Sequence, residues 1–362
     1  MANSGTTTPK IVDLAEKLIV DIRKRKLQPG DRYLSTTDAS RMLGVGNGLA
    51  NRALQLLERR EVITRQQRRG AYVSKLPSAL PKQPLRRVHF LVHQNYLESE
   101  GIGNDMVLLG MQDELPGVHV QISFLPEEEP EAFVAELINQ SFSAKAKDGF
   151  ILVRAPYEVH QLVSDSGIPA LVYGGLYPGI PRLSRLDRDM TAVGYQLADY
   201  LLKRKHKRIA FLSRQRSMPG DHDTLDAIRQ RLSEDKLPAD SITERFLPPS
   251  SAVIEAAIAQ LLKSTPRPTG FICRTLRMAD AAKAVFKRMK LEFGKEVDVA
   301  VCDYYLSASQ KPMYVYPRPL YSLEEQGRHM ARILAALARG ERAQNEVIPV
   351  NLDTTAATKA TK

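Results

Sequence analysis

The chain has 362 residues, of which 43% are apolar, so it is long enough for two or three domains with proper cores. Two cysteines, Cys273 and Cys302, are too few for a disulfide framework and predict buried free thiols in a reducing compartment. No segment reaches the roughly 20 apolar residues of a membrane span, and residues 1–10 lack the apolar core of a signal peptide. The composition therefore predicts a cytoplasmic protein with no membrane partner.

The positive charge is concentrated at the N-terminus. Residues 1–86 carry seventeen Lys and Arg against seven Asp and Glu, a balance of +10, whereas the whole chain is +11. The remaining 276 residues are therefore close to neutral. A small basic module on a large neutral body indicates a polyanion-binding head attached to a domain with another task.

The head begins with helical patterns. Apolar residues from Ile11 to Ile22 recur at three- and four-residue spacing, which predicts an amphipathic helix that stops at the Pro-Gly turn of residues 28–31. Ser35 is a suitable N-cap for a second helix that runs to Leu43. Asn47 is a plausible N-cap for a third helix after a Gly-Val-Gly turn.

A basic hairpin follows the third helix. Two short apolar runs, residues 62–64 and 71–73, flank the segment Arg-Gln-Gln-Arg-Arg-Gly at 65–70. Three helices and a basic hairpin predict a winged helix-turn-helix, whose third helix enters the major groove of DNA while the wing contacts the backbone or the minor groove. The alternative is a small helical dimerisation domain with a solvated charged face.

Residues 14–73 resemble the GntR-type DNA-binding domain in the order and spacing of the motifs PGDR, LGV and RGAYV. The family usually has Pro-Ser-Glu-Arg at the positions of 34–37 and Ser-Arg-x-Thr-Val-Arg at those of 46–51. Thr37, Asn47 and Asn51 therefore replace arginines. Because Asn pairs with adenine, we expect an operator that differs from the usual family site, or an affinity that depends on the wing and the positive field.

The predicted DNA contacts come from the second helix, the start of the third helix and the wing. They are Ser35, Thr36, Thr37, Arg41, Asn47, Gly48, Asn51, Arg52, Arg65, Arg68, Arg69 and Gly70.

Residues 77–87 read as a linker because three prolines fall within eight positions and no periodicity is present. The head is thus assigned to 1–76. From 88 to 352 short apolar strands alternate with helical segments, which predicts an α/β body with parallel sheets in two subdomains that face a cleft. The tail from 353 to 362 is polar and is predicted to be disordered.

The body resembles the LacI/GalR effector-binding domain, a periplasmic-binding-protein-like fold, through several motifs of which LLKRKHKRIAFLS at 201–213 is the most specific. The resemblance implies subdomain crossings near 188, 310 and 340. A GntR-type head on a LacI-type body occurs in sugar-responsive AraR-like repressors, which implies a homodimer that binds a palindromic double-stranded operator and a small-molecule effector.

Ligands of open parallel sheets bind beyond the C-terminal ends of the strands. The pocket residues of the family are mostly absent from this chain, and several arginines lie near strand ends instead. These arginines leave three interpretations open: an acidic or phosphorylated effector, a structural role for the arginines, or a pocket that senses nothing. The effector-binding candidates by strand-end position are Gln94, Asn95, Arg154, Tyr173, Asp189, Arg274 and Asp303.

No catalytic constellation, nucleophile elbow, phosphate-binding Gly loop or metal spacing is visible in the sequence. We therefore expect no enzyme activity, no cofactor and no metal. The preferred interpretation is a transcription regulator, and more specifically a repressor, whose operator affinity is controlled by a sugar or a sugar-derived or acidic metabolite. The alternative is a ligand-insensitive DNA-binding or architectural protein with a degenerate pocket.

Overall fold

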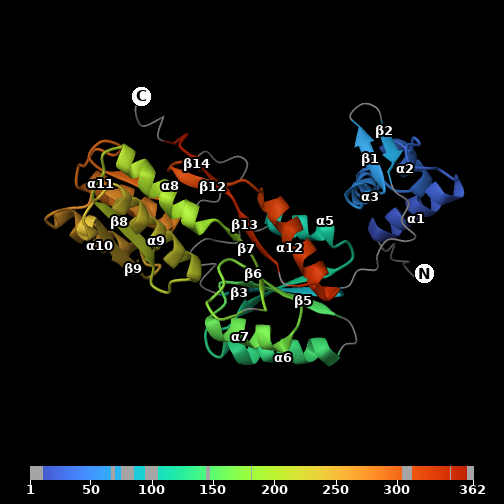
Figure 1. Ribbon diagram of the computed structural model, residues 1–362, viewed down its shortest axis with the longest axis horizontal. Helices are drawn as coiled ribbons and strands as arrows, with labels where there is room; N and C mark the ends of the chain where they lie inside the picture. The colour runs from blue at the N-terminus through green and yellow to red at the C-terminus, as the bar shows by residue number, and fades with distance from the viewer. Residues whose placement is uncertain are drawn as a thin grey trace, which may run out of the picture.

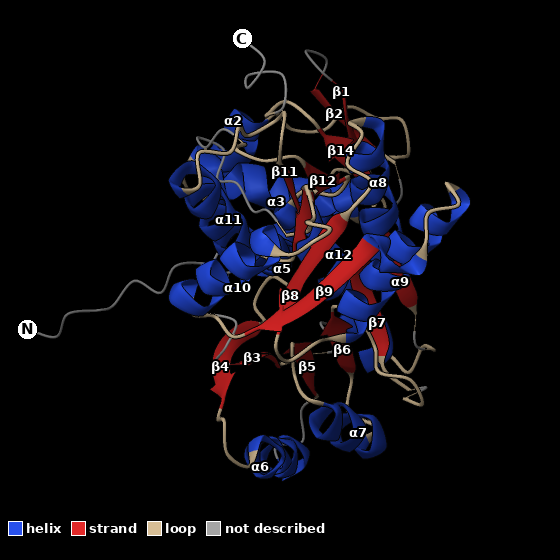
Figure 2. Cartoon of the chain, turned by 90° about the vertical axis from the view of Figure 1, so that its left-hand side faces the viewer, coloured by secondary structure: helices blue, strands red, loops and turns tan. Residues whose placement is uncertain are grey.

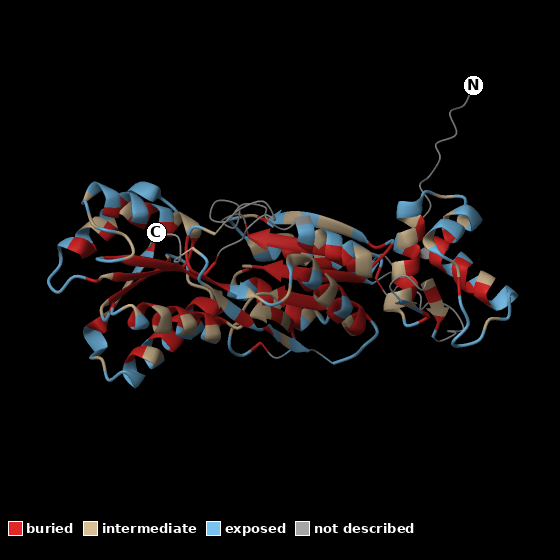
Figure 3. Cartoon of the chain, turned by 90° about the horizontal axis from the view of Figure 1, so that it is seen from above, coloured by how far each residue is buried: buried red, intermediate tan, exposed pale blue. Residues whose placement is uncertain are grey.

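The computed structural model describes residues 11–66, 70–74, 85–93, 105–143, 147–180, 182–303, 312–342 and 344–356. The chain forms a small head and a body of two α/β lobes (Figure 1). Buried side chains gather along the strands and the inner faces of the helices of each part (Figure 3). The predicted α/β class with parallel sheets is confirmed.

The head consists of α1 (Ile11–Lys24), α2 (Thr36–Leu43), α3 (Asn47–Arg59), β1 (Ile63–Gln66) and β2 (Gly70–Val73). The two strands pair antiparallel and form the predicted hairpin. Because the apolar side chains of α1 and α3 repeat at helical spacing, they meet on one face and enclose a core with the hairpin. Its buried members include Leu14, Leu18, Ile22, Leu54, Leu57 and Ile63.

The caps of the head follow from its turn residues. Ser35 caps α2 as predicted, and its hydroxyl accepts a hydrogen bond from the backbone N–H of Asp38 at 3.2 Å. Gly44 ends α2 in the left-handed region at φ +66°. The prediction that Asn47 caps α3 is wrong: Gly46 occupies the N-cap position without a side-chain hydrogen bond, and Asn47 is the first helical residue.

The first lobe of the body is built on a parallel sheet in the order β13-β7-β6-β5-β3-β4. Helices α5 and α12 cover one face, and α6 and α7 cover the other (Figure 1). The strands are β3 (Arg87–His93), β4 (His119–Leu125), β5 (Asp148–Val153), β6 (Ala170–Tyr173), β7 (Ser184–Arg188) and β13 (Asn345–Ile348), and the helices are α5 (Asp105–Glu114), α6 (Pro130–Ser143), α7 (Tyr157–Ser166) and α12 (Leu323–Ala338).

The second lobe has a parallel sheet in the order β11-β10-β8-β9, with α8 and α9 on one side and α10 and α11 on the other (Figure 2). A short antiparallel pair, β12 with β14, completes it. The elements are α8 (Met190–Lys203), β8 (Ile209–Arg214), α9 (Pro219–Glu234), a 3₁₀ turn (Ala239–Ser241), β9 (Ile242–Leu247), α10 (Ser251–Lys263), β10 (Gly270–Cys273), α11 (Leu276–Arg288), β11 (Asp298–Val301), β12 (Tyr316–Pro319) and β14 (Val350–Asp353).

The chain passes between the lobes at positions close to those expected. It leaves the first lobe after β7, which ends at Arg188, and it returns between β12 and α12 rather than near 310. The third crossing lies at Pro349 and not near 340, because β13 still pairs with β7 in the first lobe. The reason is that β13, with the sequence NEVI, has only two consecutive apolar residues and so gives a weak strand signal.

The predicted segment boundaries shift by a few residues at both ends of the body. Leu85 is buried in the core of the first lobe and Arg86 pairs with Asp148, so the described part of the predicted 77–87 linker belongs to the body. At the other end Asp353 is still paired in β14, so the tail predicted from 353 starts one residue too early. Residues 357–362 lie outside the described residues.

Cys273 and Cys302 are free and buried, as predicted. Over the described ranges no helix combines the length and the apolar character that crossing a bilayer requires. Within the same ranges no three His, Cys, Asp or Glu side chains are grouped to hold a metal ion.

Candidate ligand cleft and nucleic-acid interface

A cleft lies between the two lobes, where the C-terminal ends of strands from both sheets meet. It contains two adjoining cavities, called here the inner cavity, of about 100 Å³, and the larger cavity, of about 380 Å³. Both are lined by Arg154 and Tyr177 of the first lobe and by Arg214 and Met218 of the second. Parallel strands place their C-terminal ends at one edge, and this is the usual position of a ligand in such sheets.

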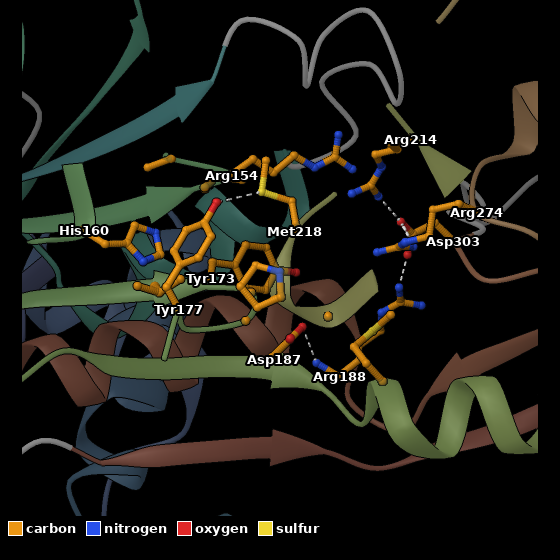
Figure 4. Close-up of a pocket in the computed structure, with 18 of the residues that line it drawn as sticks. Arg154, His160, Tyr173, Tyr177, Asp187, Arg188, Arg214, Met218, Arg274 and Asp303 are labelled. Carbon is orange, nitrogen blue, oxygen red and sulfur yellow. Dashed lines mark hydrogen bonds and ion pairs between the residues drawn. The ribbon is translucent and has the colours of Figure 1, made fainter. Parts of the chain in front are cut away.

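The inner cavity is bordered by three arginines that surround Asp303 (Figure 4), and Asp221 joins this network from behind the lining. Arg188, Arg214 and Arg274 all pair with Asp303, and the Arg214 Nη2 to Asp303 Oδ2 distance is 2.8 Å. Arg214 and Arg274 also pair with Asp221. Because Arg188 is the last residue of the first-lobe strand β7, this network links the end of that strand to the second lobe.

The network controls how its carboxylates titrate. Burial by itself would raise the pKa of Asp221, but Arg274 and Arg214 outweigh it and hold that pKa well below its usual range. Asp187, at the end of β7, behaves in the opposite way. Burial raises the pKa of Asp187 to about 6, although Arg188 opposes the shift and donates its backbone N–H to Asp187 Oδ1 at 2.8 Å.

The other end of the inner cavity is aromatic. His160 of α7 and Tyr177 pack edge to face with their ring centroids 5.0 Å apart, and the Tyr177 hydroxyl lies 3.6 Å from the sulfur of Met218 (Figure 4). Tyr173 donates its hydroxyl hydrogen to Gln326 Oε1 at 2.6 Å. Burial lowers the pKa of His160 to about 4, so its imidazole is neutral.

The comparisons with known proteins agree with this architecture. Residues 198–355 match the model of the periplasmic-binding-protein-like domain family. No curated protein matches the chain.

Solved structures extend the likeness to most of the body. A regulatory protein of the LacI family from Chloroflexus aggregans is 22% identical, with a TM-score of 0.60 over 74% of this chain and 96% of its own. A LacI-family transcriptional regulator from Enterococcus faecium with bound ribose has a TM-score of 0.59 at 16% identity over the same shares. The complex of the transcriptional regulator CelR with cellobiose covers 96% of this chain and 98% of its own, at 19% identity and a TM-score of 0.62. The first two of these neighbours are LacI-family regulators and the third is a transcriptional regulator, and all three share the fold of the chain.

The periplasmic-binding-protein-like body brings four of the predicted effector residues together. Arg154, Tyr173, Arg274 and Asp303 line the inner cavity. Asp189 does not line either cavity of the cleft, because it caps α8 by accepting a hydrogen bond from the backbone N–H of Ala192 at 2.8 Å. Gln94 and Asn95 lie outside the described residues.

Several cleft residues were not among the sequence candidates. Asp187 and Arg188 end a strand, β7, whose sequence SRLDR has only one apolar residue and so gave no strand signal. Asp221 opens α9, and its acidic side chain carried no indication that two arginines of other elements would reach it. His160 lies in the middle of α7, where a strand-end rule cannot find it.

In the head, Arg65 connects the hairpin to both helices of the helix-turn-helix. Its Nη1 donates to Asn51 Oδ1 at 3.0 Å and its Nη2 to Thr36 Oγ1 at 3.5 Å. The backbone N–H of Arg65 donates to Glu58 Oε1 at 3.1 Å. Arg65 and Asn51 therefore orient each other.

The other predicted DNA contacts are mostly exposed. Ser35 is used as a helix cap, and Arg41 forms an exposed pair with Asp38 at 3.4 Å. Gly70 opens β2 at φ +102°. Thr37, Asn47, Gly48 and Arg52 are exposed, and Arg68 and Arg69 lie outside the described residues.

Proposed function

We propose that this protein is a sequence-specific DNA-binding transcription regulator, and more specifically a repressor, whose operator affinity is controlled by a small molecule in the cleft. One observation carries the proposal. The same chain joins a basic head that presents the start of α3 and a hairpin to a two-lobed body with a cleft at the strand ends. The bound ribose and cellobiose of the structural neighbours support a small-molecule occupant.

We assign the head to the winged helix-turn-helix of GntR type. The support is the order of three helices and an antiparallel hairpin, together with the sequence motifs on its turns. In this assignment α3 enters the major groove with Asn47, Asn51 and Arg52, while the hairpin reaches the backbone. Asn51 is the best candidate for reading adenine, because Arg65 holds its side-chain oxygen.

Two heads are needed for a specific site, since a single winged helix contacts few base pairs. We therefore propose a homodimer on a palindromic operator, with the bodies supplying the dimer contact. About six to ten phosphate contacts per dimer would make the affinity fall steeply with salt concentration.

Helix α12 offers a physical connection between the cleft and the head. Its Gln326 accepts the hydroxyl of Tyr173 at the cleft, and its Arg332 lies 3.4 Å from Glu114 of α5. Glu114 Oε2 is also 3.8 Å from Nη1 of Arg59, at the end of α3. A ligand that changes the cleft would shift α12, and with it the placement of α3, by favouring one of two arrangements.

One observation favours the alternative of a ligand-insensitive DNA-binding protein. The arginines and aspartates of the inner cavity already satisfy one another, so the cleft is held together without a ligand. This alternative predicts DNA binding that no metabolite alters.

The test is selection of bound sequences from a random DNA pool by the purified full-length protein, repeated with sugars, sugar acids and sugar phosphates. A palindromic motif that one compound releases is the expected result. A motif indifferent to every compound would favour the ligand-insensitive protein, and no enriched motif would contradict sequence-specific regulation. Asn51→Ala is expected to change the selected bases, while Arg25→Ala, one residue beyond the end of α1, serves as the matched control.

A further inference from the structure

We propose that the cleft binds a hydroxylated organic anion, of the sugar-acid or sugar-phosphate class, with its anionic group among the arginines and a hydroxyl group against His160. The inference rests on the proposed function in one respect, namely that the cleft is the effector site. It differs from the ligands named for the structural neighbours, ribose and cellobiose, which are neutral.

The first observation is the charge of the cleft walls. The arginines that line the two cavities are Arg154, Arg188, Arg214, Arg216, Arg274 and Arg277. Against these six stand Asp187 and Asp303 in the lining and Asp221 directly behind it. Among the described residues of the cleft, arginines therefore outnumber carboxylates even with all three carboxylates ionised. Guanidinium groups match carboxylate and phosphate through paired hydrogen bonds.

The larger cavity is the more positive of the two. Among the described residues that line it, four are arginines and none is a carboxylate. Its remaining wall is largely apolar, with Leu247, Ile254 and Met278. Neutral sugars are usually held by carboxylate and amide acceptors, but Asp221 and Asp303 are committed to arginines here. This wall is suited to an anionic group on a compact carbon skeleton.

The second observation is independent of charge. His160 is only 2% exposed, it lines the inner cavity, and neither of its ring nitrogens has a hydrogen-bond partner. An unpaired buried polar group costs free energy, so such a side chain points to a partner supplied from outside. A neutral imidazole offers one N–H donor and one acceptor nitrogen, which is the complement of a hydroxyl group.

The two features lie at opposite ends of one space. Figure 4 shows His160 and Tyr177 at one end, Arg214, Arg274 and Asp303 at the other, and Arg154 and Met218 between them. A simple anion such as inorganic phosphate would meet only the arginines, and a neutral sugar would bring no negative charge to the larger cavity, whose described lining has arginines and no carboxylate. A ligand with both groups satisfies both ends.

The experiment measures binding to the full-length protein without DNA, by calorimetry and thermal shift, with matched pairs of compounds. The pairs are glucose with gluconate, glucose with glucose 6-phosphate, and ribose with ribose 5-phosphate; inorganic phosphate is the probe for the anion alone. We expect at least one hydroxylated anion to bind about tenfold or more tightly than its neutral partner and than phosphate. The gluconate and phosphate-ester arms distinguish a carboxylate from a phosphoryl ligand.

Substitutions at two cleft residues, with a control outside the cleft, locate the binding. Arg216→Gln, at an exposed position of the larger cavity, is expected to weaken the anion about tenfold, while Arg267→Gln, exposed outside the cleft, is expected to leave it unchanged. His160→Phe is expected to lower the affinity for the hydroxylated anion about fivefold to tenfold, and His160→Gln, which keeps a donor and an acceptor, to restore part of it.

Neutral sugars that bind as tightly as their anionic partners would overturn the inference, as would the absence of binding by every anion at millimolar concentration. Equal effects of His160→Phe on phosphate and on the hydroxylated anion would also overturn it. Because DNA is absent, these outcomes are separate from the proposed function. A palindromic operator that is released by a neutral sugar would support the proposed regulator and contradict the anionic effector.

Discussion

The head and the cleft are both rich in arginine, yet they hold it in different states. On the head the Arg41 side chain is 78% exposed and pairs with Asp38, a neighbour in the same helix. In the cleft the side chains of Arg188 and Arg274 are 10% and 8% exposed and pair with aspartates from distant parts of the chain. The same residue type is thus a hydrated, available charge in one region and a buried, committed charge in the other.

This difference sets what a substitution does. An exposed arginine keeps its water until DNA arrives, so its removal changes binding much more than it changes folding. A buried arginine or aspartate is part of an ion network, so removal of one member leaves an uncompensated charge in a poorly solvated site. The predictions below test this contrast from the largest expected effect to the smallest.

Asp303→Ala should have the largest effect on stability. It removes the carboxylate shared by Arg188, Arg214 and Arg274, and breaking a buried ion network by deleting one partner costs about 3–5 kcal/mol. Urea denaturation followed by circular dichroism measures the loss in the transition of the body. Asp240→Ala, which removes an exposed partner of Arg208, is the control and should change stability by less than about 0.5 kcal/mol. Equal effects of the two variants would mean that the cleft network is not a buried one.

Arg65→Ala should instead change DNA binding. The side chain orients Asn51 and Thr36, so its loss is expected to weaken operator binding about tenfold to a hundredfold, equivalent to about 1–3 kcal/mol, with little change in the unfolding transition. Fluorescence anisotropy with the selected operator measures the affinity. Arg25→Ala, which removes the partner of Asp21 just after the end of α1, is the control. If the variant keeps full affinity, the hairpin is not part of the DNA-binding surface.

The same contrast explains what the sequence could predict. The head is specified by local sequence patterns, so its turns, helical spacing and hairpin could be predicted without the structure. The N-cap of α3 was predicted wrongly at Asn47 because Gly46 occupies that position and has no side chain that would indicate a cap. The alternation of strands and helices predicted the α/β body. The cleft network was not predictable, because Asp221 in α9, Arg274 after β10 and Asp303 after β11 come from separate parts of the chain that only the fold brings together.

His160 shows the same limit in another form. Sequence patterns identify it as an interior position of a helix, and most buried histidines in such positions pair with a neighbour. Its meaning appears only when the structure places its ring in a cavity wall with no partner for either nitrogen. A strand-end rule therefore finds Arg154 and Tyr173 but passes over His160.

Asp187→Asn should stabilise the body at neutral pH. Because the pKa of Asp187 is about 6 in the folded protein against an ordinary value of 3.8, the folded state binds the proton more tightly than the unfolded state. Stability from this group is therefore present at pH 4 and is lost as the pH rises through 6. Asn carries no charge, so the variant should exceed the parent protein by about 1–2 kcal/mol at pH 7.5 and match it near pH 4.

Urea denaturation at the two pH values measures this difference. Asp226→Asn, on the exposed face of α9, is the matched control and should show no such dependence. A parent protein that gains stability between pH 4 and 7.5 relative to Asp187→Asn would contradict the assignment.

The smallest effects are expected at the turn between α2 and α3. Gly46 is an N-cap with φ −64° and open space around its missing Cβ, so Gly46→Ser adds a capping hydroxyl and should stabilise the head by a few tenths of a kcal/mol. Gly44 has equal space, but at φ +66° an L side chain is strained, so Gly44→Ala should destabilise the head by about 1 kcal/mol. The two variants thus separate the effect of backbone conformation on stability from the effect of the space available for a side chain. Because neither position carries charge, both variants should leave the cleft and its ligand affinity unchanged. A change in ligand affinity would show that the head and the body are more tightly coupled than the pair Arg59–Glu114 accounts for.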